Sequence, residues 1–129
     1  MSGHDLLLEE DREYLDSKEF GYEVTQEPGG LLLVVHGFEL PEAYAPRIVD
    51  LLVIIPAGYP NGCPDMFWTI PDVKRRDGSW PQSSEHHEDH GGRNWQRWSR
   101  HFIGDKWRAG IDNLRSYFAS VRIELNKGI

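Results

Sequence analysis

The chain has 129 residues, enough for one domain, and its 39% hydrophobic and 27% charged content is typical of globular proteins. Its longest apolar run, residues 51–57, is far shorter than the ~20 residues that a membrane-spanning helix needs. A single cysteine excludes an internal disulfide. We therefore expect one domain over residues 1–129, without a signal peptide or a membrane partner, in the cytoplasm.

The net charge of −7 is unevenly distributed along the chain. Residues 1–60 contain 12 acids and 3 bases (−9), whereas residues 61–129 contain 9 acids and 11 bases (+2). A general nucleic-acid binder would show a basic stripe, so this balance argues against one. It fits a protein whose two faces meet different protein partners, and it fits an ordinary solvated surface equally well.

The first half of the sequence predicts one helix and four strands. Residues 5–18 are polar, with acids clustered early, as in a short amphipathic helix. Residues 22–26 and 31–38 flank a Gly-rich turn and predict a hairpin. Residues 48–55 are apolar on both faces, as in a central strand, and residues 66–70 predict a short fourth strand.

The second half predicts a long loop followed by a helix. Residues 71–104 are polar and show neither helical nor strand periodicity, so we expect a structureless, functional connection. Residues 105–126 predict a helix with Asp105 as its N-cap. Its apolar face would comprise Trp107, Ile111, Leu114, Phe118, Val121 and Leu125. The expected fold is α+β, with helices covering one face of a four-stranded antiparallel meander.

Three segments carry reactive or binding side chains. Cys63, the only thiol, lies in a loop rich in proline and glycine and is interpreted as an apolar filler rather than a nucleophile. The histidines and acids of residues 83–90 lack the spacing of a zinc site, so we expect no metal and no cofactor. Residues 93–102 combine tryptophans with arginines, which suits either anchoring of the loop or stacking on single-stranded nucleic acid.

The spacing of several motifs resembles the ubiquitin-conjugating enzyme fold. The sequence has Tyr59-Pro60 and Pro64 between the third and fourth predicted strands, and Trp107 near the start of the last helix. The segments Gly58-Tyr59-Pro60, Pro64-Asp65-Met66-Phe67-Trp68 and Trp95-Gln96-Arg97-Trp98-Ser99-Arg100-His101 resemble a bacterial branch of that family. Members of that branch are typically encoded beside ubiquitin-like proteins, an activating enzyme and a metallopeptidase. The resemblance covers about residues 5–126 and implies an N-terminal helix, a long active-site loop and a C-terminal crossover helix.

The resemblance also implies where the reaction takes place. In the family the nucleophilic cysteine precedes the tryptophan of the crossover helix by eight residues, a position that Ser99 occupies here. The family's His-Pro-Asn tripeptide is missing, although His90 and Asn94 lie in the corresponding stretch. Ser99 would then accept the activated C-terminus of a ubiquitin-like protein from an activating enzyme, as an oxyester. A serine needs a base, for which His101 and His90 are the candidates.

Other parts of this interpretation stay open. If the chain is extended around Ser99, residues 99 and 101 point to the same side, which permits a contact between Ser99 and His101. Asn94, Arg97 or Arg100 would stabilise the oxyanion. The alternative is a catalytically inactive, conjugating-enzyme-like module that only binds a ubiquitin-like partner. Binding of single-stranded nucleic acid is a weaker third hypothesis because the net charge is negative.

Overall fold

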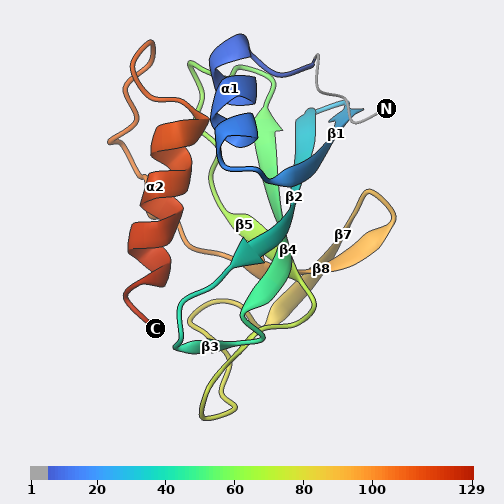
Figure 1. The fold of residues 1–129 in the computed structure, drawn as a ribbon, viewed down its shortest axis with the longest axis vertical. Helices are drawn as coiled ribbons and strands as arrows, with labels where there is room; N and C mark the ends of the chain where they lie inside the picture. The colour runs from blue at the N-terminus through green and yellow to red at the C-terminus, as the bar shows by residue number, and fades with distance from the viewer. Residues whose placement is uncertain (1–5) are drawn as a thin grey trace.

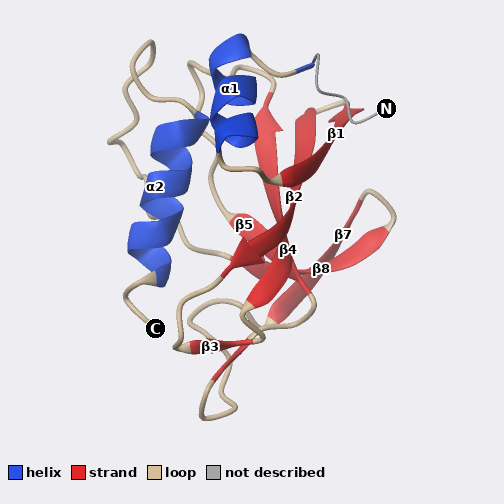
Figure 2. Ribbon diagram, viewed as in Figure 1, coloured by secondary structure: helices blue, strands red, loops and turns tan. Residues whose placement is uncertain are grey.

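The computed structural model describes residues 6–129 as two helices packed on one face of an antiparallel sheet (Figures 1 and 2). The six strands of that sheet run in the order β1-β2-β4-β5-β8-β7. They comprise β1 (Gly21–Glu27), β2 (Gly30–Glu39), β4 (Ile48–Pro56), β5 (Phe67–Ile70), β7 (His86–His90) and β8 (Arg93–Trp98). A separate two-stranded ladder joins β3 (Tyr44–Ala45) to β6 (Lys74–Arg75), and the helices are α1 (Glu9–Ser17) and α2 (Leu114–Leu125).

The four predicted strands and the α+β layering are confirmed. β1 and β2 form the predicted hairpin, and β4 lies between β2 and β5. The residues of β4 alternate between the two faces, yet Leu51, Leu52 and Val53 are all fully buried, as expected of a central strand. A bulge between Val35 and Phe38 inserts an extra residue, and both of these side chains remain buried in the helix-facing core.

Residues 71–104 are not structureless, and the prediction for this segment is wrong. It contains the β7–β8 hairpin, which adds two strands to the sheet through pairing of β8 with β5. Gly91 and Gly92 form the two-residue turn, with φ values of 58° and 80° that glycine adopts readily. The Gly-Gly pair was the available signal. It went unrecognised because β7, with the sequence His-His-Glu-Asp-His, contains no apolar residue and therefore shows no hydrophobic alternation.

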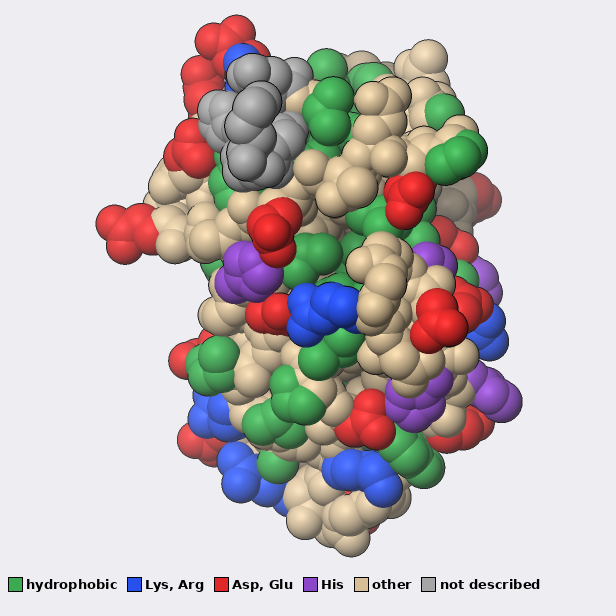
Figure 3. Space-filling model, turned by 90° about the vertical axis from the view of Figure 1, so that its right-hand side faces the viewer, with side chains coloured by type: hydrophobic (Ala, Val, Ile, Leu, Met, Phe, Trp, Pro, Cys, Tyr) green, Lys and Arg blue, Asp and Glu red, His purple; other side chains and the backbone are tan. Residues whose placement is uncertain are grey.

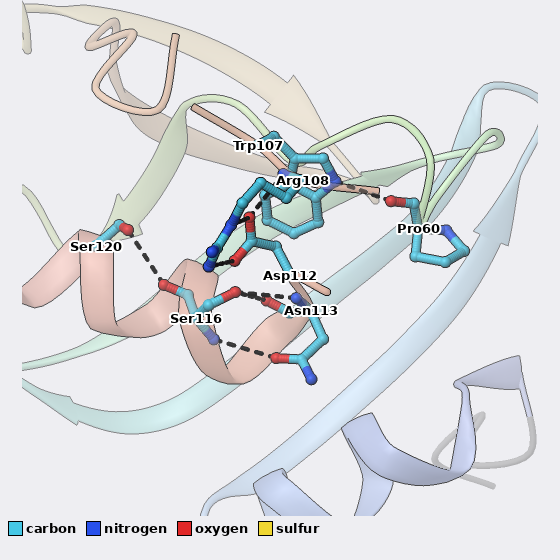
Figure 4. A network of polar contacts seen from close by, with 7 residues as sticks. All are labelled: Pro60, Trp107, Arg108, Asp112, Asn113, Ser116 and Ser120. Atoms are coloured by element: carbon cyan, nitrogen blue, oxygen red, sulfur yellow. Dashed lines mark hydrogen bonds and ion pairs between the residues drawn. The ribbon is translucent and has the colours of Figure 1, made fainter. Parts of the chain in front are cut away.

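The last helix begins at Leu114, so the expected start near Asp105 is also wrong. Its N-cap is Asn113, whose side chain accepts a hydrogen bond from Ser116 N (3.2 Å), while Ser116 Oγ accepts one from Asn113 N (2.9 Å; Figure 4). This reciprocal cap fixes the first turn of α2. Gly110 has a φ of 84°, which lies outside helical geometry. A helix that started near Asp105 could therefore not continue through Gly110 into α2.

In the segment before α2, the carbonyl of Arg108 accepts backbone hydrogen bonds from Ile111 and Asp112 in a single turn, and other polar contacts hold the segment in place. The indole of Trp107 donates to the carbonyl of Pro60 (2.8 Å), and Arg108 N donates to Asp112 Oδ2 (2.7 Å; Figure 4). Of the predicted apolar face, the four members inside α2 are buried, namely Leu114, Phe118, Val121 and Leu125. Ile111, which precedes the helix, is 65% exposed.

A second apolar cluster lies on the sheet face opposite the helices. It consists of Leu32, Leu52, Trp68 and Trp95. The β7–β8 hairpin covers part of it, because a Cβ placed on Gly91 would lie 3.4 Å from a methyl group of Leu32 in β2. Since β4 and β5 separate β2 from β8 in the sheet order, the sheet must curl to bring these segments together. Neither α1 nor α2, the helices of residues 6–129, is long and apolar enough to span a membrane.

Helix α1 is shorter than predicted and carries a buried carboxyl group. It begins at Glu9, and the predicted start at Asp5 lies outside the described residues. Asp11 is 1% exposed; it accepts hydrogen bonds from the Tyr59 hydroxyl (2.7 Å) and from Leu114 N at the start of α2 (3.1 Å). Burial raises the pKa of Asp11 above 3.8, although these two hydrogen bonds act to lower it. Asp11 therefore joins α1 to the loop after β4 and to α2.

This carboxyl group should make stability depend on pH. Because the pKa of Asp11 is higher in the folded protein, its contribution to the free energy of unfolding falls as pH rises from 3.8 through the raised value. Asp11→Asn keeps an acceptor for Leu114 N and removes the titration. As the pH rises from about 4 to about 7, the free energy of unfolding of Asp11→Asn should therefore increase relative to that of the original protein. Urea denaturation at the two pH values measures this difference. An equal difference at both pH values would contradict this prediction.

Candidate functional site

Ser99 lies immediately after β8, where the chain makes a tight turn. The amide of Arg100 donates to the carbonyl of Trp98 (2.8 Å), which closes a three-residue turn centred on Ser99. The amide of Ser99 donates to the carbonyl of Ser83 (2.8 Å) in the segment that precedes β7. The backbone of Ser99 is thus held on both sides.

A buried polar network fixes β8 against β5 and so determines where Ser99 sits. Gln96 is fully buried and bonds both the amide (2.6 Å) and the carbonyl (3.0 Å) of Val73. Thr69 in β5 donates to the Gln96 side chain (3.2 Å) and accepts from the Trp98 indole (2.9 Å). Every member finds a partner, so the network specifies the register of β8 on β5.

Ser99 opens onto a cavity of about 270 Å³ between the end of β8 and α2. The cavity is lined by Gln82, Ser83, Ser99, Arg100, His101, Phe102 and Glu124. The Oγ atom of Ser99 is buried and has no hydrogen-bond partner within residues 6–129. Leaving a buried hydroxyl without a hydrogen bond costs a folded protein about 1–3 kcal/mol of stability. Structural hydrogen bonding therefore does not explain why a serine side chain occupies this position.

The candidate base His101 lines the same cavity as Ser99. Its Nδ1 atom lies 2.8 Å from a carboxylate oxygen of Asp65, which precedes β5. The exposure of successive residues alternates here, with Trp98 and Arg100 buried and Ser99 and His101 more exposed. Both residues line one cavity, but Ser99 Oγ is buried whereas the His101 side chain is 67% exposed, and no hydrogen bond joins them within residues 6–129.

The structure does not bring His90 and Asn94 to Ser99. His90 pairs with Arg93 at the far end of the hairpin, so six strand residues, or about 20 Å, separate it from Ser99. Asn94 is about 16 Å away by the same measure. His90 instead contacts Glu88 (2.8 Å), and the Asn94 amide donates to Asp89 (2.9 Å). Both expectations are corrected, because the predicted loop is an extended hairpin.

The two candidate arginines are committed to structural contacts. Arg97 donates to Glu88 in β7 (2.6 Å). Arg100 is 6% exposed; its guanidinium donates to the carbonyls of Gln82 and Ile129 and lies 3.4 Å from Glu124 in α2. The Arg100 guanidinium is therefore not free to stabilise an oxyanion in this conformation, and its expected role is corrected, whereas Nε of Arg97 is buried and has no hydrogen-bond partner within residues 6–129.

Cys63 has the environment of an unreactive thiol. Its side chain is half-buried against the core and donates to the carbonyl of Pro64 (2.8 Å). Burial raises the pKa of the Cys63 thiol, and the nearby carboxylates of Asp65 and Asp112 raise it further. A thiol held in its protonated form is a poor nucleophile. The interpretation of Cys63 as a filler agrees with this environment.

Two other histidines on the surface are paired with carboxylates. His36 contacts both Glu23 and Asp50 (3.1 Å each), and His87 contacts Asp72 (2.7 Å). Figure 3 shows histidines among acidic and basic side chains on the face that it displays. Within residues 6–129, no three His, Cys, Asp or Glu side chains come together in a way that could hold a metal ion.

Two residues of this region were missed by sequence reasoning. Asp65 contacts His101 although the two are 36 residues apart in the chain, and Glu124 of α2 lines the cavity at Ser99. Asp65 lies within one of the segments that carry the family resemblance, but nothing in that segment indicates a partner. Glu124 is one of several acids on a helix and has no local signal.

The comparisons with known proteins bear on nearly the whole chain. Residues 7–128 match the family described as Prokaryotic E2 family E, where E2 denotes the conjugating enzymes of ubiquitin-like pathways. Comparisons with curated proteins and with solved structures give no match. The matched segment includes both helices, all the strands and the cavity at Ser99. On this match, the chain belongs to the prokaryotic E2 family E and is a prokaryotic conjugating-enzyme-like protein.

Proposed function

We propose that this protein is an acyl carrier in a bacterial ubiquitin-like conjugation pathway and that Ser99 holds the cargo as an oxyester. Family membership supports the general role. The observation that carries the finer proposal is that Ser99 Oγ has no hydrogen-bond partner among the described residues, in a residue that lines one cavity with His101. That hydroxyl has no structural task among the described residues, and a histidine is close in the chain.

The proposed reaction is an acyl transfer. The activating enzyme presents the C-terminus of the ubiquitin-like protein as a thioester. Ser99 Oγ attacks the carbonyl carbon, a C–O bond forms, and the C–S bond breaks. His101 accepts the proton from Ser99 and returns it to the departing sulfur, so the products are the Ser99 ester and a free thiol. The proposal needs no cofactor or metal on this protein.

A second cavity offers a path for the C-terminal tail of the ubiquitin-like protein. It has a volume of about 400 Å³ and shares Phe102 and Glu124 with the cavity at Ser99. Its lining also includes Trp107, Ile123 and the base Lys106. An extended tail that crossed this cavity would reach Ser99 between the segment after β8 and the surface of α2.

Covalent charging tests the proposal directly. The purified protein is incubated with the ubiquitin-like protein and activating enzyme of the same organism and with ATP, and the adduct is measured by intact mass. We expect an added mass equal to the ubiquitin-like protein less one water, located at Ser99 by peptide mapping. A reaction without ATP should give none. Charging at any other residue, or no charging at all, would contradict the proposal.

The burial of Ser99 Oγ favours a second function, a module that only binds a ubiquitin-like partner. An attacking oxygen must be reached by an acyl carbonyl, and this one is covered in the structure. The same experiment separates the two functions when binding is measured in parallel by calorimetry. Saturable binding without an adduct would support the binding module.

Cys63→Ser should leave charging at its original rate within about twofold, because the protonated, half-buried thiol takes no part in the reaction. The rate of adduct formation in the assay above is the measurement. Loss of the adduct in Cys63→Ser, with the fold intact by circular dichroism, would assign the nucleophile to Cys63.

A further inference from the structure

Asp65 is placed to control the imidazole that the proposed reaction uses. It precedes β5, whereas His101 follows β8, and pairing of β5 with β8 brings the two segments together. A carboxylate oxygen of Asp65 lies 2.8 Å from Nδ1 of His101. Nothing in the family match concerns this pair.

The contact determines which nitrogen of His101 is free to act. An ionised carboxylate only accepts hydrogen bonds, so Nδ1 of a neutral His101 carries the hydrogen and Nε2 keeps its lone pair. No hydrogen bond to Nε2 is present within residues 6–129. A carboxylate on Nδ1 that leaves Nε2 free is the arrangement that prepares histidine to accept a proton from a serine.

The proton donor of the arrangement is Ser99. Its Oγ is buried and has no hydrogen-bond partner among the described residues, although Ser99 and His101 line the same cavity, so His101 has to turn towards this oxygen for the transfer. The transfer would run from Ser99 Oγ to His101 Nε2 while Asp65 holds the opposite nitrogen.

We propose that Asp65 is a positioning residue, which orients His101 and fixes its tautomer so that Nε2 accepts the proton of Ser99. This inference rests on the proposed function and adds the residue that prepares the base. Asp65 does not touch the transferred acyl group. Its contribution is expected to be moderate, because the Asp65 and His101 side chains are 51% and 67% exposed and water screens their interaction.

The chain offers a matched control for this role. Asp72 contacts Nε2 of His87 at 2.7 Å in another exposed pair of a carboxylate and an imidazole. Neither Asp72 nor His87 lines the cavity at Ser99. Asp72→Asn therefore removes an equivalent surface contact without touching the proposed group, and its charging rate should equal that of the original protein.

The first experiment reads the tautomer and needs no partner protein. Long-range ¹H–¹⁵N spectra distinguish the protonated from the unprotonated nitrogen of each neutral histidine. His101 should carry its hydrogen on Nδ1 in the original protein and in Asp72→Asn, and should shift towards the Nε2–H form in Asp65→Asn. An unchanged His101 tautomer in Asp65→Asn would overturn the inference even if charging proceeds.

The second experiment measures charging rates in a mutant cycle. Asp65→Asn should slow charging about 10-fold, and His101→Ala about 10²-fold. The double variant Asp65→Asn/His101→Ala should be no slower than His101→Ala alone, because Asp65 acts only through the imidazole. In a Ser99→Cys background, where the more acidic thiol depends less on a base, Asp65→Asn should cost less than about threefold.

The outcomes separate the positioning role from the proposed function. Charging that survives in Ser99→Ala, or fails entirely in the original protein, overturns both. Charging that requires Ser99 but proceeds at the original rate in Asp65→Asn overturns only the role of Asp65. Additive losses in the His101 cycle would also overturn it, since a merely structural contribution of Asp65 would add to the loss of His101.

Discussion

Ser99→Ala is expected to abolish the covalent adduct, because the described cavity offers no second hydroxyl with the same neighbours. Ser83 also lines it, so Ser83→Ala is the matched control and should still be charged. The adduct on the original protein should resist a reducing agent and break in mild base, since it is an ester of a hydroxyl. Charging of Ser99→Ala, or removal of the native adduct by a reducing agent, would contradict the oxyester.

Ser99→Cys provides the complementary result. A thiol is the better nucleophile at neutral pH, so this variant should be charged and its adduct should now be cleaved by a reducing agent. The experiment is made in a Cys63→Ser background, so that the new thiol is the only one in the chain. An adduct that stays resistant to reduction would show that the cargo is attached elsewhere.

Phe118→Ala is expected to cost about 3–5 kcal/mol, a large part of the ~5–15 kcal/mol that stabilises a domain. Phe118 is fully buried in α2, and its ring lies 6.0 Å from that of Tyr14 in α1 and 6.3 Å from that of Phe38 in β2. Its removal leaves a cavity where the two helices meet the sheet. The midpoint of urea denaturation should fall while the slope of the transition is unchanged.

An exposed residue of the same helix serves as the control for this prediction. Ile123 is 67% exposed, so Ile123→Ala should change the free energy of unfolding by less than about 0.5 kcal/mol. Equal losses in the two variants would show that α2 does not pack through the face that contains Phe118.

The elements that the sequence predicted well are those with a strong apolar pattern. Residues 48–55 have apolar side chains on both faces and form the central strand β4 (Ile48–Pro56). The three- and four-residue spacing from Leu114 to Leu125 likewise matches the buried face of α2. Burial of apolar surface is the dominant favourable term in folding, so these patterns hold whatever the surroundings.

The hydrophobic pattern gave wrong predictions where polar contacts decide the structure. The β7–β8 hairpin is held by pairing, by a Gly-Gly turn and by the Arg97–Glu88 ion pair, none of which produces hydrophobic alternation. The start of α2 is decided by the cap at Asn113 and by Gly110, although the apolar spacing continues back to Trp107. A periodic apolar pattern says where a helix would be buried but does not say where its backbone hydrogen bonds end.

In the candidate site, too, the sequence predicted some features and only the tertiary structure decided others. From the sequence came the family resemblance, the position of Ser99 and the proximity of His101, because these depend on motifs and on neighbours in the chain. The tertiary structure separated His90 and Asn94 from Ser99 by extending the hairpin, committed the Arg100 guanidinium to structural contacts, and placed Asp65 beside His101. The placements of His90, Asn94 and Asp65 depend on strand pairing between β5, β7 and β8, and that of Arg100 depends on contacts with Gln82, α2 and Ile129. Both kinds of contact join residues distant in the chain and leave no local signal at either partner.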